Sequence, residues 1–246
     1  MRSELRAEHG DTIEIITVSI ETDGADASRE FIEAAAPEHP SVLDRHHQLE
    51  RLFGVVNIPN VIWIDEDGMV VRPAEAGWAG PAEYPEWLAS IMEERAKEAE
   101  AAGQDPMAAL RAGQDRDSYA DAIRDWAAKG ADSEYALSPD DAVAASQPRG
   151  GDQSAAAAHF ELGQRLWRDG DRDGAFSHWR ETHRLAPDTW TYKRQAWSLV
   201  GNEAMGGGDF GRFTQFPLPD QDWPFEGDFN TDTGALAPGE YYPKTL

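Results

Sequence analysis

The stretch FGVVNIPNVIWIDEDGMVV, residues 53–71, decides the fold. Its second half predicts a β-hairpin, because apolar runs at 61–65 and 69–73 flank the tight turn DEDG. A helix precedes this stretch and ends at Gly54, a residue type that commonly terminates helices. Pro59 lies shortly before the first hairpin strand. We therefore expect a helix, a proline-containing loop and a hairpin in direct succession.

The residues before this stretch predict a strand, a helix, a short extended piece and a second helix. Residues 12–21, TIEIITVSIE, are β-branched and mostly apolar, which is typical of a buried strand in a parallel sheet. Residues 25–40, ADASREFIEAAAPEHP, predict a short helix that its two prolines stop. Residues 41–55 predict the extended piece and then the helix that ends at Gly54. The apolar face of that second helix consists of Leu49, Leu52 and Phe53.

The residues after the hairpin predict helices and then an irregular tail. Helices are expected at about 83–102, at 117–130 and, after a linker at 138–154 rich in Ser, Pro, Gly and Asp, again at 155–200. Residues 204–246 show no periodicity, but their aromatic content indicates that they pack on something. The apolar positions that support the first two helices are Tyr84, Leu88, Ile91 and Met92, and Tyr119, Ile123 and Trp126.

Composition excludes several classes of function. The 246 residues include 22 basic and 46 acidic ones, a net charge of -24 that repels nucleic acids and anionic membranes. No apolar run has the length of a signal peptide or a membrane span, so we expect a cytoplasmic protein as the sequence is written. The absence of cysteine excludes disulfides, thiolate metal sites and thiol nucleophiles. We assign no catalytic residue, no cofactor and no metal site; His46 and His47 are adjacent, diverge on a helix and are expected at the surface.

Four segments carry a resemblance to a known family. They are IEIITVSIETDG, the long run HPSVLDRHHQLERLFGVVNIPNVIWIDEDGMVV, Gly77 within AEAGW, and RSELRAEH at residues 2–9. Together they resemble the thioredoxin fold, and most closely the TlpA and ResA type of thiol-disulfide oxidoreductase, over residues 1–102. The resemblance implies an α/β, thioredoxin-like domain that is incomplete at its N-terminus.

The resemblance also implies a substrate site. Pro59 matches the family's cis-proline, and Ile58 matches the residue whose backbone receives an extended substrate peptide. Asn60, Gly77 and Trp78 complete the predicted substrate-binding set. The implied partner is a protein or peptide thiol or disulfide. An ordinary trans proline that opens an ordinary strand is the alternative at Pro59.

The chain lacks the family's first strand and the Cys-x-x-Cys motif that follows it. In the family that strand lies at the centre of the sheet, so without it two interior edges are exposed. One explanation is a truncated gene model in which Met1 is internal, for instance because a selenocysteine codon was taken as a stop. The other is a degenerate protein whose tail, partner or second copy covers the gap.

These observations predict a relative of thiol-disulfide oxidoreductases or peroxidases that is redox-inactive as given. The alternative is a non-catalytic binding or scaffold protein.

Residues 156–190 resemble one tetratricopeptide repeat, with small and large residues spaced for packing between two helices. Its function is either a peptide groove or simply completion of a core. The predicted divisions are a thioredoxin-like domain at 1–102, a helix and linker at 103–154, a small all-α tetratricopeptide-like region at 155–203 and an irregular tail at 204–246.

Overall fold

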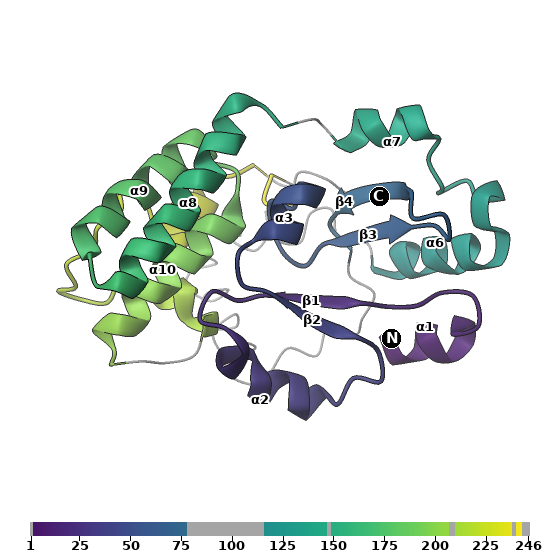
Figure 1. Ribbon diagram of the computed structural model, residues 1–246, viewed down its shortest axis with the longest axis horizontal. Helices are drawn as coiled ribbons and strands as arrows, with labels where there is room; N and C mark the ends of the chain where they lie inside the picture. Colours follow the sequence, from purple (N-terminus) through teal and green to yellow (C-terminus); the bar gives the residue numbers. More distant parts are fainter. Residues whose placement is uncertain (1, 78–115, 147–148, 207–209, 238–239, 243–246) are drawn as a thin grey trace, which may run out of the picture. The chain divides into compact units, whose positions relative to one another are not determined.

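The computed structural model describes residues 2–77, 116–146, 149–206, 210–237 and 240–242 (Figure 1). The chain is mixed α/β, as predicted, and forms two compact units. The first unit comprises Met1–Ile13, Pro59–Pro139 and Thr231–Leu246, and the second comprises Glu14–Ile58 and Asp140–Asn230. Each unit thus joins segments that are distant in the sequence, whereas the sequence suggested four consecutive divisions. The helix predicted at 83–102 lies outside the described residues.

The predicted hairpin is confirmed and forms the sheet of the first unit. Strand β3 (Val61–Ile64) pairs antiparallel with β4 (Val70–Glu75). The turn between them forms because an Asp65 carboxylate oxygen accepts the backbone N–H groups of Asp67 and Met69, at 3.1 and 2.8 Å. Gly68 has a φ of 79°, a conformation that disfavours residues with a Cβ.

Helix α6 (Arg116–Lys129) packs on this hairpin and confirms the helix predicted at 117–130. The Trp63 indole N–H donates to the Tyr119 hydroxyl at 3.0 Å, and the rings of Trp63 and Trp126 stack with centroids 5.0 Å apart. Trp63 and Tyr119 are both buried. A segment expected outside the thioredoxin-like domain therefore supplies core to the hairpin. Helix α1 (Arg2–His9) belongs to the same unit, where Arg124 of α6 pairs with Glu8.

The sheet of the second unit consists of β1 (Thr17–Ile20) and β2 (Ser41–Asp44), which pair in parallel with Val18 opposite Val42. Helix α2 (Ala25–Ala35) connects them, as predicted. Strand β1 is shorter than the predicted strand at 12–21, because its partner in the described residues has only four residues.

The rest of the second unit is helical. Helix α3 (Gln48–Phe53) ends at Gly54, whose φ is 70°, and helices α8 (Gly151–Asp169) and α9 (Arg172–Leu185) form the predicted helical hairpin. Gly163 lets α8 approach α9, since a Cβ there would lie 2.6 Å from the Trp179 indole. Helix α10 (Trp190–Ala204) follows.

The tail is largely irregular but packed, as predicted. It contains the short helices η2 (Phe210–Gln215) and α11 (Phe229–Gly234). Phe216 is buried against α10, where a Cβ on Gly201 would lie 2.0 Å from its ring, and Phe225 is also buried.

The predicted linker at 138–154 is wrong in part, because helix α7 (Pro139–Ser146) occupies its first half and α8 begins within its second. Proline suits the first position of a helix, where its missing N–H has no intrahelical partner to lose. A short 3-10 helix, η1 (Gly130–Asp132), follows α6. None of the helices in the described ranges is both long and apolar enough to cross a membrane.

Candidate functional site

The prediction of a cis peptide bond before Pro59 is wrong. Among the described residues the cis peptide bond is Phe216–Pro217, so the Ile58–Pro59 bond is trans. The trans form is favoured by about 0.5 to 1 kcal/mol for an X–Pro bond, and only surrounding structure reverses that preference. Sequence similarity around Pro59 does not supply such structure.

The backbone of Ile58, predicted to receive a peptide, is already hydrogen-bonded. Its N–H donates to the Asn57 side-chain oxygen at 2.9 Å, and its carbonyl accepts from the Arg194 guanidinium at 3.4 Å. Arg194 also donates to the Asn57 side-chain oxygen at 2.9 Å. Arg194 of α10 therefore occupies the Ile58 carbonyl and Asn57 occupies the Ile58 N–H, the two groups that an incoming strand would need.

The same loop is attached to the start of α10. The Val56 carbonyl accepts the N–H groups of Trp190 and Thr191, at 2.7 and 3.3 Å. The first N–H groups of a helix have no partner within the helix, so this contact satisfies two of them. The loop before Pro59 is thus held in place by the helical region of its own unit.

The other predicted substrate residues are Asn60 and Gly77, which lie in the first unit, and Trp78, which lies outside the described residues. The Asn60 amide donates to the Pro59 carbonyl at 3.4 Å. Gly77 is buried, and a Cβ there would lie 2.5 Å from Val61 and 2.7 Å from Tyr119, so its small size serves core packing. Trp78 lies outside the described residues.

Ile58 belongs to the second unit, whereas Pro59, Asn60 and Gly77 belong to the first.

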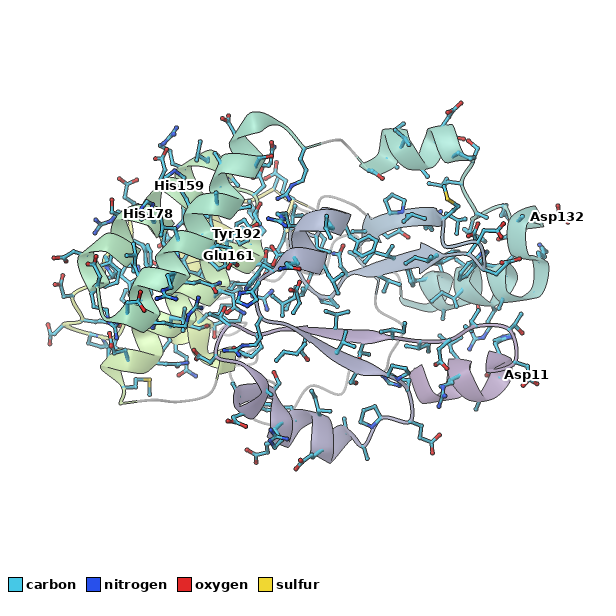
Figure 2. All side chains as sticks on the ribbon, viewed as in Figure 1. Asp11, Asp132, His159, Glu161, His178 and Tyr192 are labelled. Atoms are coloured by element: carbon cyan, nitrogen blue, oxygen red, sulfur yellow. The ribbon has the colours of Figure 1, made fainter. Side chains whose placement is uncertain are left out.

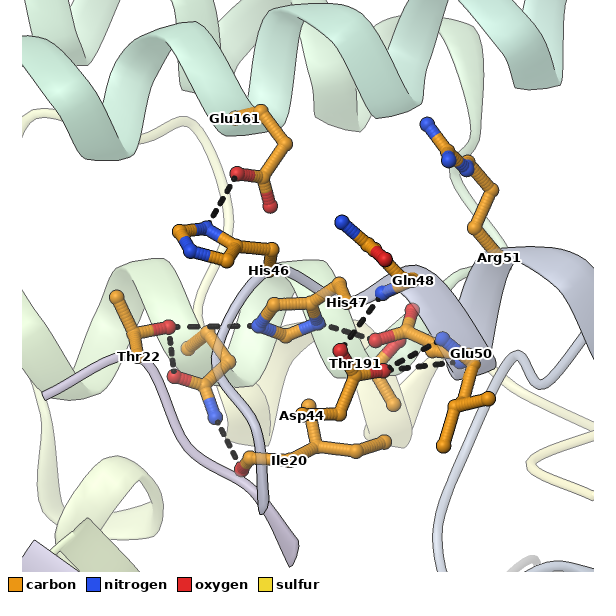
Figure 3. A network of polar contacts seen from close by, with 12 residues as sticks. Ile20, Thr22, Asp44, His46, His47, Gln48, Glu50, Arg51, Glu161 and Thr191 are labelled. Atoms are coloured by element: carbon orange, nitrogen blue, oxygen red, sulfur yellow. Dashed lines mark hydrogen bonds and ion pairs between the residues drawn. The ribbon is translucent and has the colours of Figure 1, made fainter. Parts of the chain in front are cut away.

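Figure 3 shows a network of polar side chains, several of them buried, around the turn from β2 to α3. It begins with Asp44, whose carboxylate accepts the backbone N–H groups of Gln48, Leu49 and Glu50 at 2.8, 2.7 and 3.2 Å. A carboxylate at this place satisfies the unpaired N–H groups of the helix and complements its dipole. The cap fixes the short helix that carries Glu50.

His47 lies at the centre of this group, which corrects its predicted position at the surface. Its φ of 51° is left-handed, so the imidazole turns inward and is only 2% exposed, while the neighbouring His46 side chain stays exposed near Glu161. The His47 Nδ1 atom pairs with the Glu50 carboxylate, whose other oxygen accepts from the Thr191 hydroxyl at 2.5 Å. A buried charge pair of this kind needs such additional hydrogen bonds.

On the other side of the ring, His47 Nε2 lies 3.3 Å from the Thr22 hydroxyl oxygen. That hydroxyl donates to the Gln195 side-chain oxygen at 2.9 Å, and the Gln195 amide donates to the Ile20 carbonyl at 3.1 Å. The Ile20 carbonyl only accepts, which fixes the orientation of the Gln195 amide and hence the direction of the Thr22 bond. His47 Nε2 must therefore be the donor toward Thr22.

The ionisation of the group agrees with this direction of hydrogen bonding. Burial lowers the pKa of His47, but the adjacent Glu50 carboxylate outweighs that effect, so the pKa is raised above its ordinary value. Burial also raises the pKa of the neighbouring Glu21 from 4.5 to about 7, although its carboxylate accepts the Asp23 N–H at 3.0 Å. The pKa of Glu161 is raised for the same reason, against an opposing effect of His47.

The arrangement of hydroxyl, imidazole and carboxylate has the order of a hydrolase triad but not its chemistry. A general base must accept the proton of the nucleophile, and here the Thr22 hydroxyl donates to Gln195 while His47 Nε2 donates toward Thr22. Thr22 is 4% exposed, so a substrate has no access to its hydroxyl. The group acts as a buried clamp that joins the end of β1, the β2–α3 turn and α10.

Comparisons with protein families, curated proteins and solved structures give no match to this chain. The thioredoxin-like and tetratricopeptide-like resemblances therefore stay predictions. Sequence reasoning missed the clamp, because Asp44 lies four positions before the first residue of α3, whereas the usual capping residue directly precedes its helix. Nothing local indicated that His47 would face inward toward Thr191 and Gln195, which lie far away in the sequence.

Proposed function

We propose that this chain is a redox-inactive, thioredoxin-like relative of the TlpA and ResA type of thiol-disulfide oxidoreductase. The observation that carries the proposal is the order and pairing of the strands. A parallel pair, β1 and β2, is joined through α2, and the antiparallel hairpin of β3 and β4 follows the proline loop. The resemblance implies a missing central strand between the strand predicted at 12–21 and the hairpin, and this order of elements is compatible with it.

The chemistry of the chain supports inactivity. Thiol-disulfide exchange needs a thiolate that attacks a disulfide sulfur, and the sequence has no cysteine. The buried clamp offers no substitute, because its hydroxyl donates to Gln195 and is closed to a substrate. The Ile58 backbone groups that would hold a peptide in an active relative are bonded to Asn57 and Arg194.

The test is an insulin-reduction assay with dithiothreitol, run on this chain and on a form extended by any in-frame codons upstream. We expect no acceleration by this chain, because it has no thiol. Activity of the extended form alone would support the kinship with redox enzymes. Upstream codons that encode neither a strand nor a Cys or selenocysteine motif would exclude the truncated gene model, and inactivity of both forms would favour the scaffold.

A second candidate is a scaffold that associates through the β1–β2 sheet. Val18 and Val42 face each other in register and are each 42% exposed, and Ile16 is 61% exposed. In the described residues this sheet contains β1 and β2 alone, so one edge of β1 has no strand partner there. A second copy of the chain is the occupant proposed for this sheet.

Sedimentation at low and high salt tests the scaffold proposal. The net charge of -24 opposes contact between copies, so screening by salt should strengthen a dimer that apolar residues hold together. Val18→Lys should abolish the dimer, whereas Leu52→Lys, at an exposed apolar residue elsewhere in the same unit, should not. A monomer at every salt concentration would exclude self-association.

A further inference from the structure

Two histidines meet between helices α8 and α9, away from the buried clamp. Figure 2 shows His159 and His178 close together on the two neighbouring helices. Their Nδ1 atoms are 2.7 Å apart, and the ring centroids are 5.0 Å apart with the ring planes inclined by 39°. Both residues are half-buried, so solvent reaches the pair.

The contact itself requires one proton between two nitrogens. One Nδ1 donates its N–H and the other accepts it with a lone pair, so at least one of the two rings is neutral. Neutral imidazole nitrogen is the form of histidine that binds metal ions. Loss of the shared proton leaves a lone pair on each of two nitrogens that lie 2.7 Å apart.

The helices hold the two rings in register. Close packing of Gly163 against the Trp179 indole fixes the separation of α8 and α9 one turn from the histidines. The buried Thr182 hydroxyl donates to the carbonyls of His178 and Ala156, at 3.0 and 3.3 Å, and so connects the helices on the other side. Little reorganisation is therefore needed to keep both rings directed at one ligand.

We propose that His159 and His178 form a two-imidazole site for a divalent transition-metal ion of tetragonal geometry, with Cu²⁺ the best match. Metal–nitrogen distances of about 2.0 to 2.1 Å place two nitrogens about 2.9 Å apart at an angle of 90° and about 3.3 Å apart at the tetrahedral angle. The observed 2.7 Å is close to the first value. Square-planar and tetragonal sites with nitrogen and oxygen ligands are typical of Cu²⁺ and Ni²⁺, and Cu²⁺ also binds most strongly among the divalent ions of this series.

The surroundings favour a cation and leave coordination positions for water. The chain carries a net charge of -24, which raises the local concentration of cations. Within the described ranges no group of three or more His, Cys, Asp or Glu side chains is arranged to hold a metal ion, so the described residues offer two imidazoles at this place. The site is therefore open to solvent and exchangeable, unlike a closed structural metal centre.

The test uses the full chain and Cu²⁺ alone, in a buffer that does not bind the metal. We expect one equivalent to bind by titration calorimetry, and the electron paramagnetic resonance spectrum to show a tetragonal ion with two imidazole nitrogens. His159→Gln and His178→Gln should each weaken this binding at least tenfold and remove one nitrogen from the spectrum. His39→Gln, which removes a histidine outside the pair, should change neither readout.

The spectrum of the unchanged chain keeps the proposal testable if a variant fails to fold, which circular dichroism checks. A spectrum without two nitrogen ligands overturns the proposal. So does binding that both variants of the pair retain at the original affinity, because that result assigns the ion to the acidic surface or to another histidine.

Discussion

Replacing the buried Glu21 with glutamine should raise the free energy of unfolding at neutral and higher pH. At acidic pH the substitution should have no effect. Glu21 is 5% exposed, and burial raises the pKa of its carboxyl from 4.5 to about 7. The folded protein therefore holds the Glu21 proton more tightly than the unfolded chain does. Stability that depends on this proton is fully present below pH 4.5 and is lost as the pH rises to about 7.

The magnitude follows from the shift. One pKa unit corresponds to about 1.4 kcal/mol, so the difference between 4.5 and about 7 gives an upper limit of about 3 kcal/mol at pH 8. Water near the carboxyl screens part of this, and we expect about 2 kcal/mol. Glutamine keeps the side-chain oxygen that accepts the Asp23 N–H at 3.0 Å, so the substitution removes the charge without removing that bond.

Urea unfolding of the parent and of Glu21→Gln, measured at intervals from pH 4 to pH 8, provides the test. The free energies of unfolding should agree near pH 4 and diverge above it, with the variant more stable. Glu33→Gln at an exposed position of α2 is the matched control and should show no such divergence. Equal stability of Glu21→Gln and the parent at pH 8 would refute the reasoning.

Three further substitutions test the packing and the clamp by urea unfolding. His47→Gln should cost about 3 to 5 kcal/mol, because it leaves the Glu50 carboxylate buried without its charge partner, and a cost below about 1 kcal/mol would contradict the clamp. Gly163→Ala should cost about 1 to 3 kcal/mol, because its Cβ would lie 2.6 Å from the Trp179 indole, and an unchanged midpoint would exclude that close approach. Tyr119→Phe should cost about 1 to 3 kcal/mol, because the buried Trp63 indole N–H loses the Tyr119 hydroxyl that accepts it. An unchanged midpoint would show that this hydrogen bond does not form.

The elements that the sequence predicted are those determined by nearby residues. The hairpin follows from two apolar runs around DEDG, and helix α3 ends where Gly54 adopts a left-handed conformation. The helical hairpin of α8 and α9 follows from small residues spaced for close packing, as at Gly163. In each case the decisive residues lie within about 20 positions of one another.

The features that the sequence did not predict depend on distant contacts. The length of β1 depends on β2, which lies 24 positions further along the chain at the Thr17–Ser41 pair. The burial of His47 depends on a left-handed backbone turn that helical periodicity does not reveal, and on α10. The predicted cis-proline failed for the same reason, since the isomer of an X–Pro bond is set by tertiary context.

The contacts of Ile58 connect the clamp to the proposed function. The proposed kinship assigns the backbone of the residue before the proline to an extended peptide, whereas here the Ile58 N–H is bonded to Asn57 and its carbonyl to Arg194. Arg194 lies on α10, the same helix whose Thr191 and Gln195 close the clamp around His47. One helix therefore secures the β1–β2 region and contacts the predicted peptide-binding backbone, so gain of peptide binding at Ile58 requires the Arg194 and Asn57 side chains to move and not merely the addition of a thiol. This coupling favours the view that the helical region completes the fold of its own unit before it serves any partner.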